Sequence, residues 1–197
     1  MDISRTDTEI INLALTLLGS AAVQRIDNLD ASALQKPAQA VYRNSVAELL
    51  EAYPWSFATK RLKLSRLSTP PEFGWEYQFR LPTDLMIVVG VFADEGGAAH
   101  SRTHTVDGHS LLANDPDIWL RYVSRDTQPA LFSETFVSAL SYNIASKLAR
   151  LAHGDPGDIA RLESQFRDKM DLAYKNDTQK QGIVQITPPN DFMDARN

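Results

Sequence analysis

The hydrophobic pattern of the chain changes its period twice, and this change limits the folds that the chain can adopt. Apolar residues recur at helical spacing up to Tyr53, alternate with polar residues from Phe57 onward, and return to helical spacing after Pro129. Helices at both ends with strands between them are typical of an α+β chain. We therefore expect a helical bundle formed by the N- and C-terminal helix pairs, an inserted small antiparallel β domain and an extended C-terminal arm.

Local signals place the two N-terminal helices. Thr6-Asp7-Thr8-Glu9 is a capping box, and Gly19 supplies a left-handed stop after the apolar residues that follow. A second helix begins either near Ser32 or at Lys36, where a proline follows as a favourable first helical residue. Pro54 ends it, because proline removes a backbone donor and disfavours helical geometry in the residue before it.

The middle of the chain predicts about five strands. Residues 61–65 and 75–81 alternate apolar with polar side chains, as half-buried strands do. The unbroken apolar run Leu85–Phe92 predicts a strand buried on both faces. Asp107-Gly108 predicts a hairpin turn because both residues tolerate positive φ, and residues 118–122 form the last strand.

The C-terminal third predicts two helices and an arm. Ser133 caps a long helix, and Asp155-Pro156 opens another. Helical periodicity fails from Asn176 onward, which indicates either a frayed end or a strand that orders on a partner. The expected division is a helical domain of residues 1–56 and 126–175, a β domain of residues 57–125 and a C-terminal arm of residues 176–197.

Composition excludes several classes of protein. With 197 residues and 43% hydrophobic content, the chain can bury a core of its own. The absence of cysteine excludes a disulfide scaffold, cysteine-ligated metals and thiol catalysis. The net charge of -5 excludes a general nucleic-acid coat, since affinity for DNA comes mostly from neutralised phosphates.

The sequence predicts neither a signal peptide nor a membrane span. Residues 1–7 lack a basic region followed by an apolar stretch. The longest apolar run, Leu85–Ala93, is far shorter than the roughly 20 residues that cross a bilayer. We therefore expect the protein to be made and to fold in the cytoplasm, with no membrane partner.

Catalytic and cofactor motifs are largely missing. The sequence has neither a phosphate-cradling loop nor a nucleophile turn, so we expect no cofactor and no enzyme activity. His100, His104 and His109 surround a predicted hairpin and are expected to be loop residues rather than metal ligands. Asp94-Glu95 and Asp115-x-Asp117 could form an acid/base pair, although neighbouring carboxylates in turns are usually solvated or serve as local caps. They are the basis of an alternative function, a hydrolase of polysaccharide or cell wall.

One basic stretch and one aromatic corner stand out. The basic stretch is interpreted either as a solvated strand face or as a set of contacts to phosphate or to an acidic subunit. The aromatic corner, at a helix-to-strand junction, is interpreted as a staple between domains, with a ligand-stacking platform as the alternative. The basic residues are Lys60, Arg61, Lys63 and Arg66; the corner residues are Tyr53, Pro54, Trp55 and Phe57.

Several segments, in order and spacing, carry a resemblance to a known family. They are Asn12-Leu13-Ala14-Leu15 to Gly19, the aromatic-Pro-Trp-x-Phe-Ala corner at residues 53–58, Phe73-Gly74-Trp75 leading to Leu81-Pro82-Thr83-Asp84, Val106-Asp107-Gly108 with Leu111-Leu112, Leu120-Arg121-Tyr122-Val123, and Pro129-Ala130-Leu131-Phe132. Across nearly its whole length the chain resembles the tail tubular protein A, or head-to-tail adaptor, family of short-tailed bacteriophages and prophages.

The resemblance implies a structural virion protein without catalytic residues. Such adaptors form a homo-oligomeric ring, typically a dodecamer, between the portal protein and the tail nozzle protein, and double-stranded DNA passes through without sequence-specific contacts. The protein would assemble in the host cytoplasm and end in the virion, and it could be monomeric before it meets the portal. An acidic balance suits the wall of a DNA channel, because like charge avoids phosphate contacts that would stall the duplex.

In this family the C-terminal arm commonly engages the portal. The matching segment here ends in Asp191-Phe192-Met193-Asp194-Ala195-Arg196, which is loosely similar to the aromatic-then-Arg terminus of the family. The expected portal-binding residues are Ile183, Val184, Ile186, Phe192, Met193 and Arg196.

Overall fold

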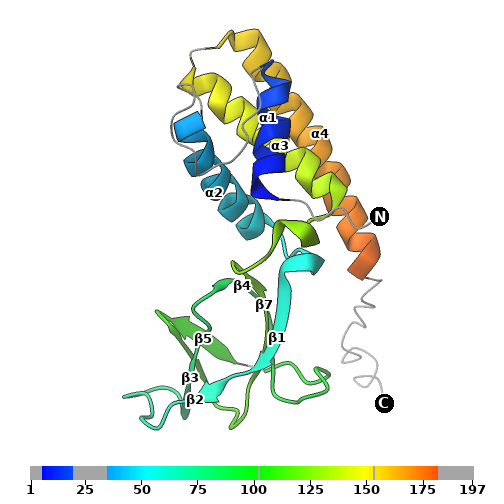
Figure 1. Ribbon diagram of the computed structural model, residues 1–197. Helices are drawn as coiled ribbons and strands as arrows, with labels where there is room; N and C mark the ends of the chain where they lie inside the picture. The colour runs from blue at the N-terminus through cyan, green and yellow to red at the C-terminus, as the bar shows by residue number, and fades with distance from the viewer. Residues whose placement is uncertain (1–5, 20–34, 102, 153, 182–197) are drawn as a thin grey trace, which may run out of the picture.

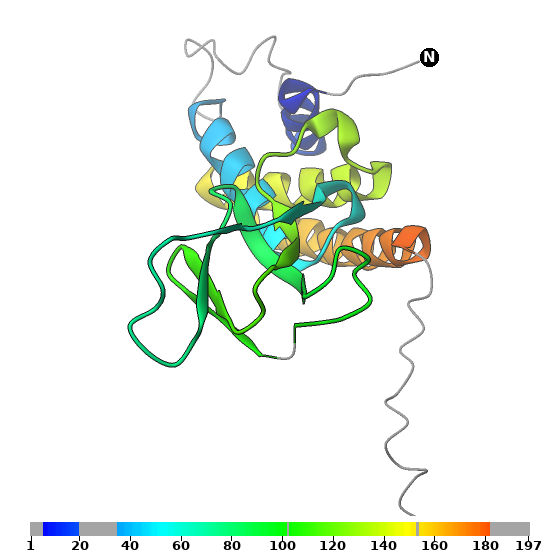
Figure 2. The same ribbon diagram turned by 90° about the horizontal axis from the view of Figure 1, so that it is seen from below.

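The computed structural model describes residues 6–19, 35–101, 103–152 and 154–181. Within them the chain combines α-helices with two small antiparallel sheets, which confirms the expected α+β class. In Figure 1 the helices lie together in the upper half of the molecule and the strands in the lower half. Figure 2, seen from below, shows the strands beneath the helices, with the end of α4 reaching to one side.

Side-chain caps mark where the first and third helices begin. The Thr6 hydroxyl accepts from the Glu9 N–H and the Glu9 carboxylate accepts from the Thr6 N–H, so the predicted capping box is confirmed. Ser133 caps the third helix by accepting from the Phe136 N–H. Ser32 lies outside the described residues. The helices are α1 Asp7–Leu17, α2 Gln35–Ala52, α3 Glu134–Leu151 and α4 Pro156–Gln181.

Helix α3 is the centre of the helical part. It packs against α1, α2 and α4. The larger apolar residues of α3 lie on one face, but residues on its other faces are buried as well. Small residues such as Ala139, Ala145 and Ser141 let neighbouring helices approach its other sides. Leu151 at its end is exposed, whereas Leu148 in the same last turn is fully buried.

The strands form two antiparallel sheets. One sheet has the order β1-β7-β4 and the other the order β2-β3-β6-β5. The predicted hairpin is confirmed: β5 and β6 pair on either side of a turn in which Gly108 has a φ of +57°. The strands are β1 Thr59–Lys63, β2 Ser65–Arg66, β3 Tyr77–Arg80, β4 Leu85–Phe92, β5 His104–Asp107, β6 Ser110–Ala113 and β7 Trp119–Ser124. Two 3₁₀ turns, η1 Ser56–Ala58 and η2 Pro129–Leu131, lead into and out of the β part.

Strand β4 is less buried than its unbroken apolar run predicts. Val91 is its one fully buried residue, and the other seven are half-buried. The strand lies at the edge of its sheet, and its register with β7 shifts between Leu85 and Ile87 and again between Val88 and Gly90. An edge position leaves part of a strand uncovered, so the prediction of burial on both faces is wrong.

Two hydrophobic cores meet at the sheet β1-β7-β4. The larger core lies among the helices, and Val123 of β7 belongs to it. The smaller core lies between the two sheets and includes Phe79, Leu111 and Ile118, together with Leu120 and Tyr122 of β7. Because side chains alternate along a strand, β7 serves the helical core from one face and the β core from the other.

Helix α4 continues to Gln181, six residues beyond the predicted boundary at residue 175. The expectation that residues 176–181 belong to an extended arm is therefore wrong. The last part of the helix is held by hydrogen bonds that join Asp177 to Ser56 and Gln181 to Pro54, two residues that follow α2. The prediction missed this part because it relied on the spacing of apolar residues, which does not detect polar contacts. The rest of the expected arm lies outside the described residues.

Candidate functional sites

The aromatic corner is part of a buried ring cluster between the helices. Trp55 is fully buried, and its indole N–H donates to the Leu49 carbonyl at 2.6 Å. Its ring centroid lies 4.9 Å from Tyr53, 5.7 Å from Phe57, 4.9 Å from Phe136 and 5.4 Å from Tyr174. These separations are typical of edge-to-face and offset aromatic pairs.

This geometry bears on the two interpretations of the corner. A ligand-stacking platform needs an accessible ring face, and Trp55 has none. The corner instead joins elements from both ends of the chain, since Tyr53 to Phe57 follow α2 while Phe136 and Tyr174 belong to α3 and α4. Pro54 contributes its carbonyl, which accepts from the Gln181 side-chain amide at 2.9 Å.

Asp177 of α4 fastens the helix to this corner, and the sequence analysis missed it. Its side chain is almost fully buried and accepts from the Ser56 N–H at 3.0 Å, from the Ser56 hydroxyl at 2.6 Å and from the Gln181 amide at 2.7 Å. Thr178 donates to the Tyr174 carbonyl, so the Tyr53 hydroxyl is the donor in the 2.7 Å contact with Thr178. A buried carboxylate needs such partners because an unpaired one is costly.

Lys60 belongs to a polar cluster at the start of the β part. Its ammonium lies 3.0 Å from Asp84 and 3.6 Å from Asp126, and this hydrogen bond with Asp84 raises the pKa of Lys60. Asp84 also accepts from the Ser124 hydroxyl at 2.6 Å and from the Tyr122 hydroxyl at 3.2 Å. Burial alone would raise the pKa of Asp84, but hydrogen bonds from Ser124 and Lys60 outweigh it and hold that pKa below its usual value.

The four basic residues do not form one surface. Lys60 faces Tyr122 across the β1–β7 ladder, whereas Arg61 and Lys63 point to the opposite face. Lys63 pairs with Asp117 at 2.8 Å and lies 4.8 Å from the centroid of the Trp119 ring. Arg66 lies in the other sheet, with its guanidinium 5.0 Å from the Tyr77 ring. The structure therefore brings together only Arg61 and Lys63.

Three of the four carboxylates behind the hydrolase alternative, all but Glu95, have structural partners in the described part of the chain. Asp94 accepts from the N–H groups of Ala98 and Ala99, the latter at 2.6 Å, and so holds the turn after β4. Asp115 accepts from the Ser101 hydroxyl at 2.7 Å, and Asp117 pairs with Lys63. Each of these three carboxylates therefore already has a hydrogen-bond or ion-pair partner within the protein.

The three candidate histidines are not brought together as ligands. His100 lies 4.7 Å from the Phe92 ring, measured between centroids, while His104 begins β5 and His109 lies in the following turn. Among the described residues, no group of three or more His, Asp or Glu side chains is arranged to hold a metal ion.

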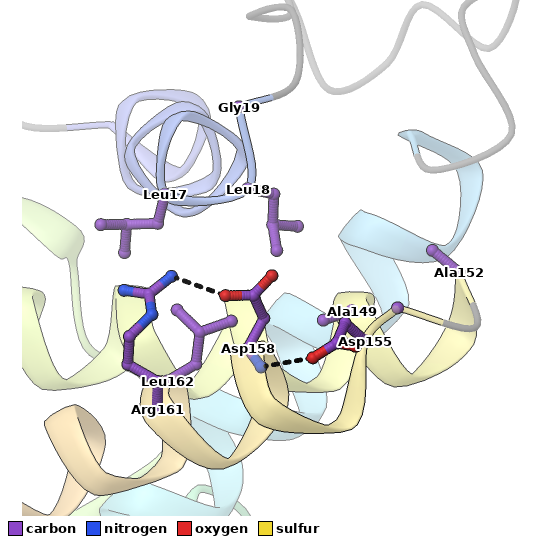
Figure 3. Close-up of a pocket in the computed structure, with 10 residues that line it drawn as sticks. Leu17, Leu18, Gly19, Ala149, Ala152, Asp155, Asp158, Arg161 and Leu162 are labelled. Carbon is purple, nitrogen blue, oxygen red and sulfur yellow. Dashed lines mark hydrogen bonds and ion pairs between the residues drawn. The ribbon is translucent and has the colours of Figure 1, made fainter.

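A pocket of 440 Å³ lies where α1 ends above the start of α4 (Figure 3). Leu17 and Leu18 line one side, and polar residues of α4 line the other. The polar groups satisfy one another, because Arg161 lies 3.5 Å from Asp158 and Asp155 accepts from the Asp158 N–H at 3.3 Å. Because these side chains are paired with one another, the pocket offers a ligand few unpaired polar groups.

The predicted portal-binding residues, from Ile183 to Arg196, lie outside the described part of the chain. None of the helices that the structure describes is long and apolar enough to cross a membrane. Comparison with protein-family models and with curated proteins finds no match to this chain.

Proposed function

We propose that this chain is a structural virion protein that forms a head-to-tail adaptor ring between a portal and a tail nozzle. The observation that carries the proposal is the order of the family-like segments along a helix–sheet–helix chain. The aromatic-Pro-Trp-x-Phe-Ala segment supports it, because the buried Trp55 ring packs against Phe136 of α3 and Tyr174 of α4, from the other end of the chain. In this proposal the two terminal helix pairs form the ring-forming bundle, and the inserted β domain faces the next tail component.

Apolar side chains on the helical part support lateral contacts between copies. Leu13 of α1, Leu151 of α3 and Leu172 of α4 are each about half exposed, with exposed fractions of 44%, 54% and 44%. Single exposed leucines are common on monomers, so these residues support a ring only together with the family resemblance. Burying them between neighbouring copies would add a hydrophobic contribution to ring assembly.

The portal-binding segment of the proposal begins after Gln181. Residues 177–181 belong to α4 and hold the corner through Asp177 and Gln181, so a truncation at residue 176 would damage the fold as well as the arm. A truncation that removes residues 182–197 tests the arm alone. We expect it to leave the melting temperature unchanged and to abolish binding to the portal.

Native mass spectrometry of the protein, alone and mixed with the portal of the phage or prophage that encodes it, tests the proposal. We expect a complex with many copies per ring that forms only with the portal. A protein that stays monomeric or dimeric beside the correct portal would contradict the adaptor proposal. Full binding by the protein truncated after Gln181 would contradict only the role of the arm.

The hydrolase alternative has its own assay. Turnover of purified capsule or peptidoglycan that is lost in Asp94→Asn or Asp117→Asn would favour it over the adaptor. Asp107→Asn, an exposed change in the β5–β6 hairpin, is the matched control.

A further inference from the structure

One face of the sheet β1-β7-β4 brings two arginines together. Arg61 of β1 lies directly opposite Arg121 of β7, and Gly90 of β4 lies on the other side of Arg121. One step along the same face, Lys63 and Phe92 flank Trp119. Directly paired residues of an antiparallel ladder project to the same side, so these side chains share one surface.

A pocket of 710 Å³ opens on this surface. Its size is within the range of small-ligand sites. Gly90 helps to shape it, because a Cβ atom there would lie 2.9 Å from the Phe92 ring, which therefore folds over the glycine. The lining residues used here are Arg61, Arg121, Trp119, Phe92, Asp94 and Glu95.

The two arginines have no anionic partner in the described part of the chain. Two acidic groups near them are engaged elsewhere: Asp117 pairs with Lys63, and Asp94 accepts from backbone N–H groups. Glu95 also lines the pocket but forms no ion pair with either arginine in the described structure. Outside the backbone ladder, no hydrogen bond or ion pair joins the side chain of Arg61 or Arg121 to another described residue, and Arg121 Nε is buried without a partner. Like charges directly opposite each other destabilise a sheet, and a buried unpaired donor adds to that cost.

We propose that this pocket binds a carboxylate that carries an apolar group. The two guanidiniums would hold the carboxylate oxygens, since arginine matches planar oxyanions through paired hydrogen bonds. The apolar group would lie on Trp119 and Phe92. Asp94 and Glu95 at the same pocket disfavour a polyanion such as duplex DNA, whose phosphates would meet these carboxylates as well. The inference rests on the pocket alone and does not depend on the proposed function.

Titration with phenylacetate, followed by the NMR signal of the Trp119 indole N–H, tests the site. We expect a saturable shift at millimolar concentrations in the native protein. Arg61→Gln and Arg121→Gln should each weaken binding at least tenfold. Arg80→Gln is the matched control, because Arg80 is exposed on β3 in the other sheet, and it should bind as the native protein does.

Melting temperatures measured without ligand separate a binding role from a folding role. We expect Arg61→Gln and Arg121→Gln to melt at or above the native temperature, because each removes the like-charge pair. Arg61 is exposed, so Arg61→Gln still tests the site if Arg121→Gln fails to fold. Unchanged phenylacetate affinity in Arg61→Gln would overturn the proposal, as would the absence of any saturable shift.

Three further probes identify the source of the carboxylate. An acetylated, amidated peptide with Asp next to Phe that binds at least tenfold more tightly than phenylacetate would support an acidic side chain of a protein partner. Equal affinities would support a free carboxylate ligand. Arginine-dependent binding of inorganic phosphate or of a DNA duplex, without binding of phenylacetate, would overturn the carboxylate assignment.

Discussion

The helical part and the β part of this protein differ in the charge of the buried polar group that each leaves unpaired. In the helical part, the buried carboxylate of Asp177 and the indole N–H of Trp55 each have a close partner within the same core. In the β part, Arg121 is half-buried with its Nε unpaired, and Arg61 lies opposite it without an anion. Among the described residues the helical part also leaves a neutral group unpaired, Asn143 Oδ1 of α3, whereas the β part leaves a guanidinium nitrogen unpaired. An unpaired charged group costs more than a neutral one.

The sheet β1-β7-β4 connects the helical core with the pocket of the β part. Val123 at one end of β7 packs into the helical core, while Arg121 and Trp119 lie further along the same face, where the pocket opens. The helical core therefore anchors the strand, and the uncovered part of its face stays available for contacts.

The largest expected effect is the loss of the aromatic centre of the helical part. Trp55→Ala should lower the free energy of unfolding by about 3 to 5 kcal/mol, because it removes a fully buried ring and leaves a cavity. Urea denaturation measures this change. Phe73→Ala, at a position that is 85% exposed in the β part, is the control and should change stability by less than about 0.5 kcal/mol. Equal effects at both positions would remove the contrast between the two regions.

A smaller effect is expected where α4 meets the corner. Asp177→Ala should destabilise the protein by about 2 to 3 kcal/mol, because it leaves the Ser56 N–H and hydroxyl without their acceptor. Hydrogen exchange should show faster exchange in the last turn of α4 than in its first turns. Asp168→Ala, an exposed change on the same helix, is the control. Native protection of residues 177–181 in Asp177→Ala would mean that the helix holds without this contact.

The smallest effect concerns the polar cluster of the β part. Asp84→Asn should lower stability at pH 7 by about 1 kcal/mol, since it weakens the contacts with Ser124 and with the partly exposed Lys60. The folded pKa of Asp84 lies below its unfolded value, so its stabilisation is present above about pH 4 and is lost as the pH falls through the folded pKa.

Urea titrations between pH 7 and pH 2 test this dependence. The difference between native protein and Asp84→Asn should shrink toward acid pH. Asp117→Asn removes a pair whose side chains are both about half exposed, and it should cost less than about 0.5 kcal/mol at pH 7. If the stability difference between native protein and Asp84→Asn grows on acidification, the folded pKa of Asp84 is raised and not lowered.

Features that depend on near neighbours in the chain were predictable. The Thr6 capping box, the Ser133 cap and the Asp107-Gly108 hairpin each need only residues a few positions apart, and all three predictions are confirmed. The prediction failed at the end of α4, where Asp177 is held by Ser56, which is 121 positions away in the sequence. A hydrophobic period does not detect a polar contact of that range.

The sequence by itself determined the α+β class, the caps and turns, and the aromatic composition of the corner. Tertiary structure decided the length of α4, the half-exposed state of β4 and the division of the basic residues between two faces and two sheets. It also decided that Arg61 faces Arg121, because this depends on the pairing of strands about sixty residues apart. Caps and turns are stabilised by interactions between residues close in the sequence, whereas strand register and burial depend on which distant segments pack together.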